Sequence, residues 1–154
     1  MNNIKGDLID LAKKGEFDVI AHGCNCFCTM GAGIAPQMAA AFGCDKFPLE
    51  DYKYSGDETK LGKIDYKTIK IGEKDLTVVN AYTQYGLGGN PFDYEAFTKI
   101  VDEMNIVFKG KHIGLPKIGA GLAGGSWPKI SSIIENGFKD CEVTIVTYKP
   151  VYHG

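Results

Sequence analysis

Short runs rich in β-branched residues alternate along this chain with stretches that have the periodicity of helices. The apolar runs cover residues 18–22, 76–82, 112–118 and 143–148, and the helical patterns cover 33–42, 92–108 and 126–138. Strands that alternate with helices favour a parallel sheet, because the helices carry the chain back to start the next strand in the same direction. The pattern therefore predicts an α/β fold of three layers, α/β/α, with a mixed, largely parallel central sheet.

Two further segments belong at the margins of that sheet. The run 63–71 alternates polar and apolar residues, which is typical of a half-exposed strand near an edge. Residues 2–9 predict a short strand that turns into a helix, and Gly15 would end this helix. The chain has 154 residues and contains no internal repeat or low-complexity linker. We therefore expect residues 1–154 to form a single domain.

The charged residues limit how the protein can bind a phosphate. All 17 cationic residues are lysines, so the bidentate guanidinium fork of arginine is missing, and phosphate must be held by backbone N–H groups, hydroxyls or lysine. The net charge is -2, which gives no basic surface for duplex nucleic acid. The sequence shows no membrane span or secretion signal, and its five cysteines are an odd number. These features predict a cytoplasmic protein.

Two glycine-rich segments follow predicted strands and precede predicted helices. They read CTMGAGIA (28–35) and PKIGAGLAGGSW (116–127). Such junctions lie at the carboxyl ends of strands, where α/β folds bind ligands, and their backbone N–H groups and helix N-termini favour anions. Neither segment matches the dinucleotide fingerprint G-x-G-x-x-G or the P-loop. Together they predict a crevice that holds a diphosphate.

The cysteines of CNCFC (24–28) raise the alternatives of a metal site and a redox site. Zinc needs several ligands that converge on one ion, and no second cysteine pair follows in the sequence. The redox motif C-x-x-C is also absent. We interpret these cysteines as small residues that pack a tight loop, and we expect neither a metal nor another cofactor.

The same segments resemble the macrodomain family of ADP-ribose-binding modules. The resemblance rests on AHGCNCFCTMGAGIA, on PKIGAGLAGGSW, on GDL near the start and on TYKP at the end, so it spans nearly the whole chain. It is closest to the branch that contains the yeast-type ADP-ribose 1″-phosphate phosphatase and the terminal ADP-ribose glycohydrolases. The patterns H-x-C-N-C and G-x-G-I-A and the stretch AYTQYGLGG (81–89) resemble the phosphatase. The glycohydrolases use a lysine and an aspartate, where this chain has Gln84 and Ala123.

The resemblance implies roles for individual residues, each with a structural alternative. His22, at the end of a predicted strand, would orient or activate water or protonate the leaving oxygen, or it is a buried residue that orients the loop. Asn25 would contact the distal ribose, or it stabilises a turn. Asp7 would accept a hydrogen bond from the adenine amine, or it caps a helix. Tyr148 would lie against the adenine face, or it is a core aromatic.

His22 and Asn25 are thus the predicted catalytic residues. The other predicted ligand contacts come from the first helix, the two glycine loops and the end of a central strand: Asp7, Leu8, Thr29, Met30, Gly31, Ala32, Gly33, Ile34, Thr83, Gln84, Pro116, Ile118, Gly119, Ala120, Gly121, Leu122, Ala123 and Tyr148. Lys117 would add positive charge near the second loop or be solvated. We expect Trp127 to belong to the core.

The function implied by the resemblance is binding of ADP-ribose and hydrolysis of ADP-ribose 1″-phosphate, without a metal. One alternative is a module that reads ADP-ribose on a modified macromolecule without turnover. Another is an ADP-ribosyl hydrolase that acts on protein or nucleic acid, although the missing lysine and aspartate leave it without an evident nucleophile. The expected partners are therefore ADP-ribose, its 1″-phosphate or an ADP-ribosylated macromolecule, and the expected state is a monomer.

Overall fold

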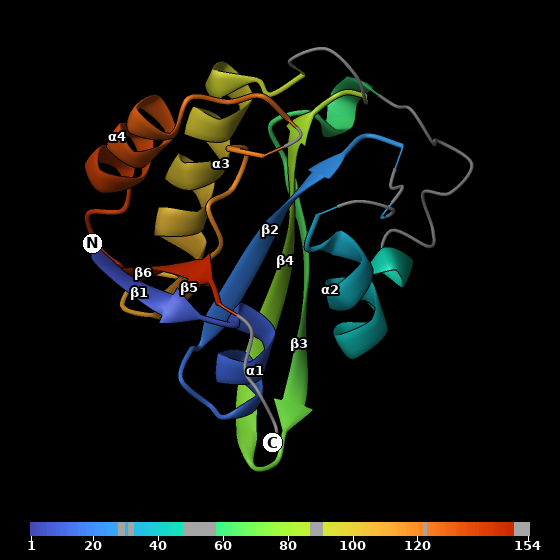
Figure 1. The fold of residues 1–154 in the computed structure, drawn as a ribbon, viewed down its shortest axis with the longest axis vertical. Coiled ribbons are helices and arrows are strands. Elements are labelled where there is room, and N and C mark those ends of the chain that lie inside the picture. Colours follow the sequence, from blue (N-terminus) through green and yellow to red (C-terminus); the bar gives the residue numbers. More distant parts are fainter. Residues whose placement is uncertain (28–29, 31–32, 48–57, 87–90, 122, 150–154) are drawn as a thin grey trace.

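The computed structural model describes residues 1–27, 30, 33–47, 58–86, 91–121 and 123–149 (Figure 1). Strands and helices alternate along the chain, as the sequence predicts. The elements are β1 (Asn2–Gly6), α1 (Leu8–Lys13), β2 (Val19–Asn25), α2 (Ala35–Phe42), the 3₁₀ turn η1 (Cys44–Lys46), the 3₁₀ turn η3 (Glu58–Lys60), β3 (Ile64–Ile71), β4 (Lys74–Gln84), α3 (Tyr94–Val107), β5 (His112–Leu115), α4 (Trp127–Gly137) and β6 (Glu142–Tyr148).

Six strands form one sheet in the order β1-β6-β5-β2-β4-β3. Every neighbouring pair is parallel except β3 and β4, which are antiparallel. The predicted mixed, largely parallel sheet is confirmed, and so is the edge position of the 63–71 strand. Polar side chains point outward along β3, which is the usual way in which an edge strand avoids pairing with other chains.

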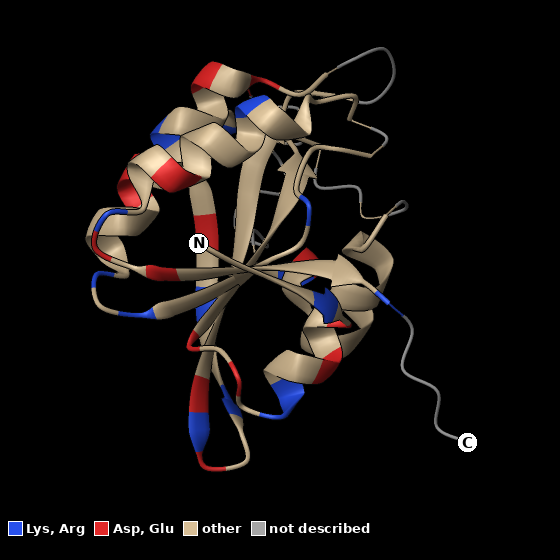
Figure 2. Ribbon diagram, turned by 60° about the vertical axis from the view of Figure 1, so that its left-hand side comes forward, with Lys and Arg blue, Asp and Glu red and all other residues tan. Residues whose placement is uncertain are grey.

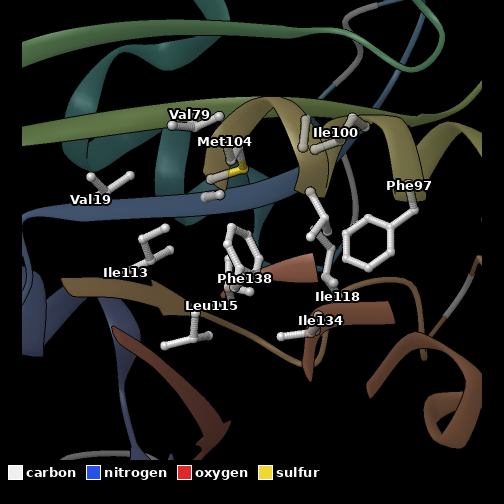
Figure 3. Close-up of a cluster of buried hydrophobic side chains, with 14 of the residues drawn as sticks. Val19, Val79, Phe97, Ile100, Met104, Ile113, Leu115, Ile118, Ile134 and Phe138 are labelled. Atoms are coloured by element: carbon white, nitrogen blue, oxygen red, sulfur yellow. The ribbon is translucent and has the colours of Figure 1, made fainter. Parts of the chain in front are cut away.

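Helices cover both faces of the sheet, which confirms the three layers. Figure 1 shows α3 and α4 on one side of the central strands and α2 on the other, with α1 packed near α2. Because successive side chains of a strand point to opposite faces, Val19 and Ala21 pack under α3 and α4, whereas Ile20 packs under α1 and α2. The larger cluster is drawn in Figure 3 and includes Val19, Val79, Phe97, Ile100, Met104, Ile113, Leu115, Ile118, Ile134 and Phe138.

The helices begin and end within two residues of the predicted bounds. Asp93 caps α3, since its Oδ1 accepts a hydrogen bond from the backbone N–H of Ala96 at 2.9 Å. Pro128 stands in the first turn of α4, where its missing N–H costs nothing. No helix in the described ranges is long and apolar enough to cross a membrane.

The carboxyl ends of the five mutually parallel strands meet at one edge of the sheet. There, β2 and β5 lead into the two glycine loops, β1 leads into α1, and β4 leads toward α3. The fold therefore brings the segments that carry the predicted site to a common edge, whatever their separation in sequence.

Figure 2 shows lysine and acidic residues interspersed along the helices and along the hairpin that joins β3 to β4.

Candidate functional site

The ends of β2 and β4 form the middle of this edge. Asn25, the last residue of β2, is only 4% exposed, and its Oδ1 accepts a hydrogen bond from the N–H of Phe27 at 2.9 Å. This contact is the turn-stabilising role that the sequence left open for Asn25. At the end of β4, the side chain of Gln84 donates to the carbonyl of Gly86 at 2.8 Å, while Thr83 is buried. A side-chain to backbone hydrogen bond thus fixes the first residues after each strand end.

His22 lies in the interior of β2, three residues before the strand ends, so the prediction that it ends the strand is wrong. Its side chain is 0% exposed. The side-chain nitrogen of Asn80 donates to the carbonyl of Cys44 at 2.9 Å, which leaves the amide oxygen of Asn80 to accept from His22 Nε2 at 2.7 Å. His22 therefore carries its proton on Nε2, and the three residues tie β2, β4 and η1 together.

Burial keeps His22 neutral. Desolvation lowers its pKa from 6.5 to about 4, although the hydrogen bond that His22 donates to Asn80 opposes this change. Its Nδ1 is buried and has no hydrogen-bond partner among the described residues. The Sγ atoms of Cys24 and Cys44 lie 3.5 and 3.6 Å from Nε2. A fully enclosed, neutral imidazole cannot exchange protons with a ligand at the surface, so the buried alternative for His22 is the one observed.

The thiols around His22 belong to this packed interior. Burial raises the pKa of Cys44 to about 11, and the charge of Asp45 adds to the increase. Among the described residues, no group of three or more His, Cys, Asp or Glu side chains is arranged to hold a metal ion.

The first glycine loop is described at Met30, Gly33 and Ile34, whereas the predicted contacts Thr29, Gly31 and Ala32 lie outside the described residues. Met30 is partly buried against the core, with its Sδ 3.9 Å from the Sγ of Cys44. Gly33 has a positive φ of 63°, and no atom of the described residues lies within 4 Å of the place where a Cβ would stand. The chain thus turns into α2 at Gly33 with open space beside its backbone.

The second glycine loop is folded tightly against the core. Gly119 has a φ of 76°, and a Cβ at this position would come within 2.4 Å of the ring of Phe92. The N–H of Gly125 donates to the carbonyl of Gly119 at 2.7 Å, which closes the loop on itself. By contrast, a Cβ on Gly121 would meet no atom within 4 Å in the part of the chain that the structure describes. Internal packing therefore requires glycine at 119, while the backbone at 121 faces open space.

The remaining predicted contacts of this loop differ in exposure. Ile118 is buried in the core, and Pro116, Ala120 and Ala123 are partly buried, while Leu122 lies outside the described residues. Trp127 packs against the core as expected, and the Nζ of Lys117 lies 5.7 Å from the centre of its ring.

The ends of β1 and β6 bring Asp7 and Tyr148 together. Gly6 pairs with Tyr148 in the parallel register, so Asp7 follows directly beside it. The Oδ1 of Asp7 accepts from the N–H groups of Ile9 and Asp10 at 3.0 and 3.1 Å, which is the helix-capping role left open by the sequence. Tyr148 is 70% exposed, so it is not a core aromatic. Leu8, in contrast, has its side chain in the core.

Two residues near the site were missed by sequence reasoning. Asn80 lies in an apolar run of the sequence, and nothing in the sequence indicates that its side chain accepts a hydrogen bond from His22. Lys60 is 9% exposed, and its Nζ lies 5.4 Å from the ring centre of Tyr82. A lysine is solvated by default, so only the folded structure reveals its burial.

Comparisons with known proteins agree with this architecture. No family model matches the sequence. The chain is 36% identical over 156 residues to an uncharacterized 17.5 kDa protein of the tk-vs intergenic region of Enterobacteria phage T4, with 96% of each chain covered. It is 29% identical over 148 residues to the human ADP-ribose glycohydrolase OARD1, covering 94% of this chain and 88% of the human protein.

Solved structures share the fold. The macrodomain of Thermus aquaticus DarG superposes with a TM-score of 0.68 at 19% identity, with 97% of each chain covered. Thermosipho africanus DarTG in complex with ADP-ribose superposes with a TM-score of 0.74 at 15% identity, covering 98% of this chain and 42% of that one. The chain therefore belongs to the same family as the phage T4 protein, and its fold is that of the macrodomains. Its particular relatives are the phage T4 protein and, at greater distance, the human glycohydrolase.

Proposed function

We propose that this protein binds ADP-ribose derivatives in a crevice along the carboxyl edge of its sheet. One observation carries the proposal: Asp7 and Tyr148, the two glycine loops and Asn25 all emerge at this edge. In the proposed orientation, adenine lies at the exposed ring of Tyr148, the diphosphate lies over the loops, and the distal ribose lies near Asn25. The ADP-ribose complex of Thermosipho africanus DarTG, which has the same fold, supports this choice of ligand.

We further propose that the reaction is hydrolysis of ADP-ribose 1″-phosphate. Water would add to phosphorus and the bond between phosphorus and the ribose oxygen would break, giving ADP-ribose and inorganic phosphate. Backbone N–H groups of the loops would hold the diphosphate and fix the terminal phosphate in place. Because His22 is buried and neutral, we assign it a positioning role through Asn80 and Cys44 rather than a proton transfer to the substrate.

A second candidate is hydrolysis of ADP-ribose from a modified macromolecule. The similarity to the human ADP-ribose glycohydrolase over 94% of this chain favours it. The residues at the two positions expected to carry its chemistry, Gln84 and Ala123, provide neither an amine nucleophile nor an acid. This activity would therefore need a different set of residues.

The test combines phosphate release from ADP-ribose 1″-phosphate with calorimetric titration of ADP-ribose. We expect the parent to show both, and Tyr148→Ala to weaken ADP-ribose binding by about tenfold, as loss of one base-stacking ring does. Tyr66→Ala is the matched control, because Tyr66 is an exposed ring on β3, the sheet edge remote from β6. Binding without phosphate release would refute the phosphatase. ADP-ribose released from a modified protein would then identify the hydrolase, and no binding at all would refute the whole proposal.

A further inference from the structure

Lys60 is the one cationic side chain that is buried among the residues the structure describes, with 9% of its surface exposed. Removing an ammonium group from water is costly, and a chain keeps such a charge where something compensates it or makes use of it. One compensating group is the ring of Tyr82, whose centre lies 5.4 Å from Nζ. The neighbouring Lys63, in contrast, is exposed.

The position of Lys60 relates it to the candidate site. The residues that follow the turn η3 are hydrogen-bonded to the end of β4. The N–H of Gly62 donates to the carbonyl of Tyr82, and the N–H of Tyr82 donates to the carbonyl of Lys63, both at 3.0 Å. Tyr82 stands two residues before β4 ends and pairs with Cys24 of β2. Figure 1 shows this turn, coloured green, near the tips of β2 and β4. Lys60 therefore lies at the carboxyl edge of the sheet.

The same residues support the first glycine loop. Cys24, Cys26 and Tyr82 form a small buried cluster, and Met30 of that loop packs against it together with Leu61. The ring that faces Lys60 thus belongs to the cluster beneath the loop that we propose to hold phosphate. A positive charge here would act on the distal part of the ligand rather than on adenine, which we place near Tyr148.

The ring beside Lys60 is held in a fixed orientation. The hydroxyl of Tyr82 donates to Oδ2 of Asp65 at 2.6 Å, and Tyr82 itself is 1% exposed. A buried ring anchored at both ends restricts where the lysine stem and its ammonium can lie. Such a preset charge favours an anion without the entropy cost of ordering a surface lysine.

From this arrangement we propose that Lys60 selects ligands that carry an anionic group on the distal ribose of ADP-ribose, such as a phosphate monoester. The inference rests on the proposed ADP-ribose site and adds a specificity residue to it. The chain has no arginine, so lysine is the side chain that carries a full positive charge at neutral pH. ADP-ribose itself ends in a hydroxyl at this position, so the charge of Lys60 would distinguish the two ligands.

The experiment measures the affinities of ADP-ribose and ADP-ribose 1″-phosphate for the parent, Lys60→Met, Lys60→Arg and Lys63→Met. We expect Lys60→Met to weaken binding of the 1″-phosphate by about tenfold or more, the usual effect of losing one charged hydrogen bond, with ADP-ribose affinity nearly unchanged. Lys60→Arg should retain the preference because it retains the charge. Lys63→Met, one turn away and exposed, should behave as the parent does. If Lys60→Met proves unfolded by circular dichroism, Lys60→Gln replaces it, with the same expected loss.

The outcomes separate this inference from the proposed function. Equal weakening of both ligands by Lys60→Met, or no weakening of either, overturns the role of Lys60 and leaves ADP-ribose binding intact. The same loss of preference in Lys63→Met would also overturn it, because a general electrostatic effect would then suffice. A parent that binds neither ligand overturns both the site and the inference.

Discussion

Replacing Gly119 by alanine tests the packing of the second glycine loop. The left-handed φ of 76° costs alanine about 1–2 kcal/mol. The new Cβ would also stand 2.4 Å from one carbon of the Phe92 ring and 2.5 Å from another. Phe92 is itself buried and packs on Tyr94 and Phe97, so the ring has little room to move, and overpacking adds about 1–3 kcal/mol. The expected loss is therefore about 2–5 kcal/mol, out of a typical total of roughly 5–15 kcal/mol.

Urea unfolding at neutral pH measures this loss, and two alanine variants serve as matched controls. Gly33→Ala has a similar φ but open space around its Cβ, so it should lose only the backbone term of about 1–2 kcal/mol. Gly121→Ala has no positive φ and its Cβ would contact none of the described residues, so it should change stability by less than about 0.5 kcal/mol. If Gly119→Ala unfolds at the same urea concentration as Gly121→Ala, the argument from Phe92 is refuted.

Three further predictions concern titrating groups and the helix cap. Folding lowers the pKa of His22 from 6.5 to about 4, so the unfolded chain takes up a proton that the folded protein does not; stability should be full above about pH 6.5 and fall by roughly 3 kcal/mol as the pH approaches 4. Urea unfolding at several pH values checks this, and His22→Asn should remove that part of the slope. Asp7→Asn should keep the cap of α1 while Asp7→Ala loses about 1 kcal/mol, and a drop in ADP-ribose affinity for the asparagine variant at unchanged stability would report an adenine contact. A maleimide should leave Cys44 unmodified in the folded protein and label it in urea, because the thiol is buried and its pKa is raised to about 11; rapid labelling of the native state would contradict this.

The sheet could be predicted because most of its strands are rich in β-branched residues. The alternating polar face of 63–71 identified an edge strand, and β3 occupies that place. The residues at which the strands end could not be predicted as well. β2 continues past His22 through Gly23, Cys24 and Asn25, residues that carry no strand signal and are held there by pairing with β4. β5 ends at Leu115, directly before Pro116, which has no N–H to continue the sheet.

Only those parts of the candidate site that lie at glycine loops or at strand ends could be predicted from the sequence. The positions of Asp7 and Tyr148 follow from strand ends, and the pairing of β1 with β6 brings them together. The sequence left the burial of His22 as one of two alternatives and gave no sign of the burial of Lys60, because both depend on side chains that are distant in sequence, such as Asn80 and Tyr82. A polar residue gives the same sequence signal whether it faces water or the interior.

The position of β1 has a consequence for how the protein is made. Among the described strands β1 is the first along the chain, and its single neighbour in the sheet is β6, the last. On a ribosome, β1 leaves the exit tunnel well before its partner is synthesised, so the sheet can be completed only when residues 142–148 have emerged. Pairing of strands that are so distant in sequence is slow, and until β6 is available the unpaired β1 can associate with other chains. A nascent chain stalled before residue 142 should therefore leave the first strand accessible to protease while the β3–β4 hairpin is already protected.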